Sequence, residues 1–164
     1  MKHIISIVAA LTLSLSTFAQ VNITKVDKVE PTDEMFMDMA VTVAQKVKSD
    51  GQKPGGAVVI LNGAMRGAGV PTDDASPEEN AIAKTKRSKL NGATIYTVNQ
   101  PTTAALNAIM AADADAVYFV NPSSAVVAAG IYTDADYDPA GLDSSAKPVP
   151  TYQLNYPPAS LLLK

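Results

Sequence analysis

The chain of 164 residues has no cysteine and no tryptophan, and its single histidine is His3. The absence of cysteine excludes disulfides, thiolate metal ligands and a cysteine nucleophile. With histidine confined to the third residue, no imidazole further along the chain can bind zinc or act as a general base. The formal net charge is −3 and there is no basic stripe, which argues against nucleic acid as a partner.

Residues 1–19 have the pattern of a secretory signal peptide. A positive start at Lys2 precedes an apolar run, which ends in the small-residue pattern Thr17-Phe18-Ala19. The run is shorter than the roughly 20 apolar residues that a membrane-spanning helix needs. We therefore expect a secreted or periplasmic protein with no membrane contact after cleavage. Residues 20–164 have the length and composition of a single domain.

Residues 20–31 form an N-terminal segment that is a short strand or an arm. Strand and helix patterns alternate in the rest of the chain. This order implies parallel strands joined by right-handed crossovers, in a three-layer α/β/α domain with a mixed sheet of about five strands. The dipeptide Asn62-Gly63 predicts a tight hairpin. The predicted helices are 33–48, 76–86, 103–112 and 121–130, and the predicted strands are 57–61, 64–70, 94–99, 116–120 and 151–156, the last at an edge of the sheet.

Two helix starts carry clear capping signals. In Ser76-Pro77-Glu78-Glu79, serine can cap the helix, proline suits the first turn, and the second glutamate completes a capping box. In Gln100-Pro101-Thr102-Thr103, a threonine hydroxyl can cap the following helix in the same way. Both starts follow a loop, and we expect their free N–H groups to point toward the same place.

These two segments resemble the core of the cytidine deaminase superfamily, especially its guanine and tRNA-adenosine deaminase branch. There one helix opens with His-Ala-Glu-x-Asn-Ala-Ile and the next with Glu-Pro-Cys-x-x-Cys. Here the corresponding runs are Ser76-Pro77-Glu78-Glu79-Asn80-Ala81-Ile82 and Gln100-Pro101-Thr102-Thr103-Ala104-Ala105. The resemblance implies a cytidine deaminase-like fold. Proteins of this family often form dimers, so a homodimer is one expectation.

The resemblance also shows which catalytic parts are missing. By position, the family's zinc-binding histidine becomes Ser76, and its two cysteines become Thr102 and Ala105. Hydroxyl groups are weak zinc ligands and alanine is none, so we expect no zinc and no other cofactor. The proton-shuttling glutamate is retained as Glu78, while the family's substrate-contacting asparagine aligns with Pro71.

Three functional classes remain open. The favoured one is a non-catalytic module that binds a small nucleobase-like or nucleoside-like ligand at the helix N-termini, where Tyr96, Asn99, Gln100 and Thr102 could line a cleft. The alternative is a divergent deaminase-type hydrolase that uses Glu78 as its base. The third is a scaffold without any ligand.

Two further patterns resemble metal sites. Met35, Met37 and Met39 have the alternate spacing of some copper sites, but on a helix they cannot converge, so we favour core packing. Residues Asp134, Asp136 and Asp138 have the spacing of a calcium loop, without the glycine and glutamate that such a loop requires. We interpret these three acids as solvated charge.

Overall fold

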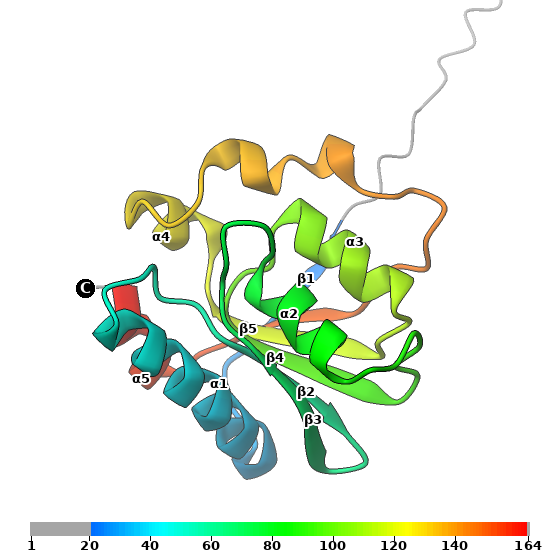
Figure 1. The fold of residues 1–164 in the computed structure, drawn as a ribbon, viewed down its shortest axis with the longest axis horizontal. Helices are drawn as coiled ribbons and strands as arrows, with labels where there is room; N and C mark the ends of the chain where they lie inside the picture. Colours follow the sequence, from blue (N-terminus) through cyan, green and yellow to red (C-terminus); the bar gives the residue numbers. More distant parts are fainter. Residues whose placement is uncertain (1–20, 164) are drawn as a thin grey trace, which may run out of the picture.

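The structure, a computed structural model, describes residues 21–163. The predicted signal peptide, residues 1–19, lies outside the described residues. A six-stranded sheet, in the order β1-β6-β5-β4-β2-β3, lies between α1 and α5 on one face and α2 and α3 on the other (Figure 1). The strands are β1 (Ile23–Val26), β2 (Ala57–Leu61), β3 (Ala64–Gly69), β4 (Ala93–Asn99), β5 (Ala116–Asn121) and β6 (Thr151–Leu154). The helices are α1 (Pro31–Ser49), α2 (Pro77–Lys84), α3 (Thr103–Ala111), α4 (Ser123–Ala128) and α5 (Pro157–Ser160), with short 3-10 turns η1 (Asp134–Tyr137), η2 (Pro139–Gly141) and η3 (Leu161–Leu163).

This architecture confirms the predicted three layers and mixed sheet, with one strand more than expected. The extra strand is β1, which pairs in parallel with β6, so that β6 is internal and its predicted edge position is wrong. The signal for β1 is weak because its four residues, Ile-Thr-Lys-Val, are mostly exposed. Within the described residues, no helix is long and apolar enough to cross a membrane.

Helix α1 begins two residues earlier than predicted. Proline is favoured at the first helical position, because its missing N–H would have no partner there, and Pro31 takes that position after Glu30. The buried face includes Met37, which is fully buried, whereas Met35 is 47% exposed and Met39 is half-buried. The three methionine side chains therefore do not converge, as the helical spacing predicted.

The predicted hairpin is present between β2 and β3, with positive φ angles of 53° at Asn62 and 71° at Gly63. Helix α2 then lies directly on β3 because glycine is found where the backbones meet. A Cβ atom at Gly67 would come within 2.1 Å of the Ala81 carbonyl oxygen, and one at Gly69 within 1.9 Å of the Pro77 carbonyl oxygen. This close approach fixes where α2 begins.

The central strand β4 contributes side chains to both cores. Ile95 packs with Ala81 of α2 and Ile109 of α3, whereas Tyr96 and Val98 pack in the cluster on the α1 side. Successive residues of a strand point to opposite faces. Odd-numbered residues of β4, such as Ile95, therefore face α2 and α3, and even-numbered residues, such as Tyr96, face α1.

Candidate functional site

The two predicted helix caps are present at the carboxyl end of the sheet. The Ser76 hydroxyl accepts a hydrogen bond from the Glu79 amide at 3.2 Å, and the Glu79 carboxylate accepts one from the Ser76 amide at 2.8 Å, which completes the capping box. The Thr102 hydroxyl accepts a hydrogen bond from the Ala105 amide at 3.2 Å and caps α3. The two hydroxyls at positions that the resemblance aligns with zinc ligands thus stabilise the starts of their own helices.

This set of side chains does not fit zinc. Structural and catalytic zinc sites use histidine, cysteine and carboxylate ligands. Ser76 and Thr102 offer only neutral hydroxyls that already accept backbone hydrogen bonds, and Ala105, which is fully buried, has no ligand atom. Among the residues that the structure describes, no group of three or more His, Cys, Asp or Glu is placed to hold a metal ion.

Glu78, the retained acid of the motif, is buried between α2 and the sheet. Its side chain is only 3% exposed, and the hydroxyl of Thr97 on β4 donates a hydrogen bond to its carboxylate. Burial raises the pKa of Glu78 above its ordinary value of 4.5, and the Thr97 hydrogen bond offsets part of that rise. The carboxyl group therefore acts as part of the packing between α2 and β4.

A hollow of about 770 Å³ opens above the two helix starts. Its walls come from the loop before α2, the start of α3, and the segment that follows α4. The lining includes Lys53, Pro54, Pro71, Thr72, Asp73, Asp74, Ala75, Ser76, Glu79, Thr102, Ala104, Val127, Gly130, Ile131, Tyr132, Thr133, Asp134 and Asp136. Glu78 is absent from this lining, so the retained acid lies behind the hollow.

Of the four side chains predicted to line a ligand cleft, Thr102 alone lines this hollow. Tyr96 lies on the opposite face of the sheet, where its hydroxyl donates to Asp33 at 2.5 Å and its ring contacts Phe36. Because Tyr96 precedes Thr97 on a strand, the two side chains must point to opposite faces. We therefore remove Tyr96 from the candidate site.

The other two predicted residues hold loops in place. The Asn99 side chain donates to the Pro54 carbonyl at 2.9 Å and accepts from Asn121 at 3.0 Å. The Gln100 side chain accepts from the Ser123 amide at 2.9 Å. These hydrogen bonds tie the ends of β4 and β5 to the loops that follow α1 and precede α4. Asn99 and Gln100 thus shape the site from behind without lining the hollow.

The sequence did not indicate the tyrosine pair that covers this region. The rings of Tyr132 and Tyr137 meet edge to face with centroids 6.2 Å apart, and the Tyr137 hydroxyl donates to the Gln100 carbonyl at 3.1 Å. Burial raises the pKa of both tyrosines, and the nearby charge of Glu78 raises it further. The two tyrosines in the otherwise polar segment after α4 were the signal in the sequence that could have indicated a role at the site.

The predicted calcium-like acids make local hydrogen bonds. The Asp136 carboxylate accepts from the amide and hydroxyl of Thr133 at 2.7 and 2.9 Å, and the Asp138 carboxylate accepts from the Ala140 amide at 2.9 Å. Two of the three acids thus cap short 3-10 turns at the surface. Asp134 and Asp138 are exposed, in agreement with the solvated charge that we expected.

Comparison with known proteins identifies the fold. No protein-family model and no curated protein sequence matches the chain. Among solved structures, a tRNA A34 deaminase aligns with a TM-score of 0.61 and 19% identity, over 79% of this chain and 99% of its own. The protein has a cytidine deaminase-like fold. The guanine deaminase of Nitrosomonas europaea aligns with a TM-score of 0.62 and 18% identity, over 84% of this chain and 85% of its own.

The cytidine deaminase-like fold is also shared with the guanine deaminase of Bacillus subtilis, at a TM-score of 0.59 and 28% identity, over 75% of this chain and 85% of that protein. Other similar structures were determined in complex with 8-azaguanine or 2,6-diaminopurine. These matches confirm the cytidine deaminase-like fold that the sequence resemblance implied.

Proposed function

We propose that this protein is a non-catalytic binding protein whose ligand is a purine-like base or nucleoside. The observation that carries the proposal is the hollow itself, which opens where the helices α2 and α3 begin, although the side chains there do not suit zinc. Proteins of the same fold bind 8-azaguanine and 2,6-diaminopurine, which supports a purine-like ligand here.

The charges around the hollow favour an uncharged ligand rich in N–H donors. Its lining contains five carboxylates and one cation, Lys53, whose ammonium group donates to the Ile131 carbonyl at 3.0 Å. Carboxylates accept hydrogen bonds from amino groups and ring N–H groups, and they repel phosphate. The base or the nucleoside should therefore bind better than the nucleotide.

Aromatic and hydroxyl groups complete the chemistry of the hollow. Tyr132 lines it and offers a ring on which a planar heterocycle can stack. Ser76 and Thr102 line it as well, and a hydroxyl that already accepts one hydrogen bond can still donate one. The sequence alternative, a hydrolase based on Glu78, is less well supported because that carboxyl is buried against Thr97 and lies outside the lining.

The test is a titration with guanine, guanosine and guanosine monophosphate. Ala104 is exposed, lines the hollow and lies on the first turn of α3, so Ala104→Trp should fill the space and block binding. Ala111→Trp, at the exposed far end of the same helix, is the matched control. We expect guanine and guanosine to bind the native and Ala111→Trp proteins and not Ala104→Trp, with no release of ammonia.

Two outcomes would contradict the proposal. If no purine binds the native protein at millimolar concentration, the scaffold class without a ligand is correct. If ammonia is released from guanine, and release stops in Glu78→Gln, the hydrolase class is correct. Secretion remains part of the proposal and is tested by the N-terminus of the protein isolated from its native cells, which should be Gln20.

A further inference from the structure

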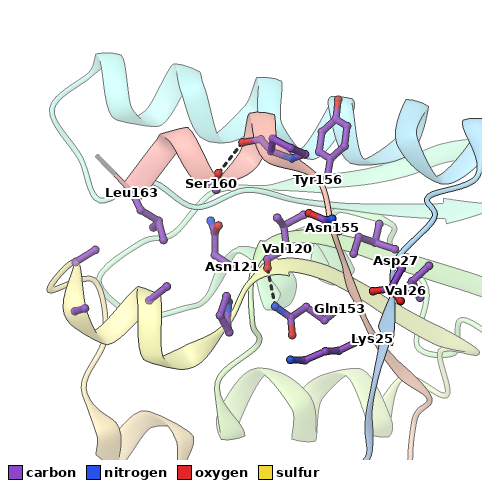
Figure 2. A pocket seen from close by; sticks show the side chains of 16 residues that line it. Lys25, Val26, Asp27, Val120, Asn121, Gln153, Asn155, Tyr156, Ser160 and Leu163 are labelled. Carbon is purple, nitrogen blue, oxygen red and sulfur yellow. Dashed lines mark hydrogen bonds between the residues drawn. The ribbon is translucent and has the colours of Figure 1, made fainter.

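A second hollow, of about 760 Å³, lies at the carboxyl ends of β1, β6 and β5 (Figure 2). It is separate from the hollow described above, because no lining residue is shared between the two. Its walls come from the ends of those three strands, from α4, and from the segment formed by α5 and η3.

The topology of the sheet creates this hollow. After β5 the chain enters α4, which contacts η1 on the side of α3, whereas after β6 it enters α5, which packs with α1 on the opposite face. Adjacent parallel strands whose following segments diverge leave a crevice at their carboxyl ends. In open α/β sheets, ligands bind in crevices of this kind.

The hollow combines an apolar interior with small residues that leave space. Val26, Val120 and Leu154 line it at the ends of three neighbouring strands, and Leu163 lines it from η3. On α4 the lining positions are alanines, Ala125 among them, so that this wall has no large side chain. An apolar group about the size of a leucine or phenylalanine side chain suits such a space.

Polar side chains also line the hollow, and its two charged side chains come from the end of β1. Figure 2 shows Lys25 extending beside Gln153, whose amide donates to the Val120 carbonyl at 3.4 Å, on the side opposite Ser160 and Leu163. Asp27 follows two residues after Lys25 and also lines the hollow. No described residue forms an ion pair with either of these two side chains. Within residues 21–163, Lys25 and Asp27 thus border the apolar space without an ion-pair partner.

We propose that this hollow binds the zwitterion of an apolar amino acid, with the ligand carboxylate at Lys25, its ammonium group at Asp27, and its side chain between α4 and Leu163. Two opposite charges cancel in the lining, so a ligand with a single charge would meet one attractive and one repulsive group. A zwitterion meets an attractive partner at each end. The apolar interior selects leucine-like or phenylalanine-like side chains over polar ones.

The test titrates three probes that share a phenyl ring against the protein, followed by NMR. Phenylalanine carries both charges, 3-phenylpropionate carries the carboxylate alone, and phenethylamine carries the ammonium group alone. We expect phenylalanine to bind most tightly and to perturb residues at the ends of β5 and β6. Both charged side chains are exposed. Loss of one exposed charge pair should therefore weaken binding by about two- to fivefold. Lys25→Met should lower affinity for phenylalanine and 3-phenylpropionate, and Asp27→Asn for phenylalanine and phenethylamine.

Two further variants control the design. Ala128→Trp fills the hollow from the exposed end of α4 and should abolish binding of all three probes. Lys28→Met removes a nearby exposed charge that does not line the hollow and should leave binding unchanged. Circular dichroism verifies that each variant is folded.

Three results would overturn the proposal. The first is no binding of phenylalanine to the native protein at 10 mM, which is about the weakest affinity that the contacts above can provide. The second is 3-phenylpropionate or phenethylamine binding as tightly as phenylalanine. The third is binding that persists in a folded Ala128→Trp protein. Purine binding at the other hollow is measured separately, and its outcome neither supports nor contradicts the amino-acid site.

Discussion

The buried carboxyl of Glu78 makes a strong prediction about how stability depends on pH. Burial raises the folded-state pKa of Glu78 above the ordinary value of 4.5 that applies in the unfolded chain. Between these two pKa values the folded state binds more protons than the unfolded state. The stabilisation from Glu78 is therefore fully present below about pH 4.5 and is lost as the pH rises through the folded-state pKa.

The size of this effect follows from the same linkage. For each pH unit that separates the two pKa values, the free energy of unfolding falls by about 1.4 kcal/mol as the pH rises. The substitution Glu78→Gln places a group that cannot ionise in the same space, and its carbonyl oxygen can still accept the hydrogen bond from Thr97. We expect this variant to lack the Glu78 contribution to the pH dependence as the pH rises from 4.5.

The assay is urea unfolding of the native protein, Glu78→Gln and Glu79→Gln at half-unit intervals upward from pH 4.5. Glu79→Gln is the matched control because glutamine also serves at this position of a capping box and the buried Glu78 stays in place. It should keep most of the native slope, because the charge of Glu79 raises the pKa of Glu78 less than burial does. A Glu78→Gln protein whose free energy of unfolding has the same pH slope as the native protein would refute the buried, proton-binding role of this carboxyl.

Four further outcomes are expected. Gly69→Ala should lower the free energy of unfolding by about 2 kcal/mol or more, because its Cβ would overlap the Pro77 carbonyl oxygen. The control Gly51→Asn, at an open position of positive φ, should lower it by less than about 1 kcal/mol in the same urea assay. Tyr96→Phe should cost about 1 kcal/mol through loss of its hydrogen bond and leave purine titrations unchanged. Elemental analysis of the purified protein should give no stoichiometric zinc, and one zinc per chain that survives mild chelation would contradict the site description. Millimolar calcium should leave the melting temperature unchanged, and a rise of several degrees that is lost in Asp136→Ala would reveal a calcium site.

Local signals in the sequence were sufficient to predict the elements around the site. The capping box at Ser76 depends on residues three apart, and the hairpin at Asn62-Gly63 depends on two adjacent residues with positive φ. Such features are fixed by short-range chemistry, and the structure confirms both. The order of strands and helices followed from the same kind of signal, and it carried the prediction of the fold.

Long-range packing decided what the sequence could not predict. A strand covered on both faces, such as β4, has no alternation of apolar and polar residues, so nothing local showed that Tyr96 faces α1 while Thr97 faces Glu78. Tyr132 lines the site from the segment between α4 and η1, and no local pattern in the sequence placed that segment there. Strand β1 is recognisable only through its partner β6, because its own residues are mostly exposed.

We propose that the hollow between the starts of α2 and α3 binds a purine-like ligand and leaves it chemically unchanged. A crystal structure of the protein soaked with 8-azaguanine tests it most directly. We expect the intact base to stack on Tyr132, within hydrogen-bond distance of Ser76 or Thr102, with Glu78 still hydrogen-bonded to Thr97 behind it. A hollow that stays empty in the soaked crystal, or a base held by an exposed Glu78, would show that the proposed binding mode is wrong.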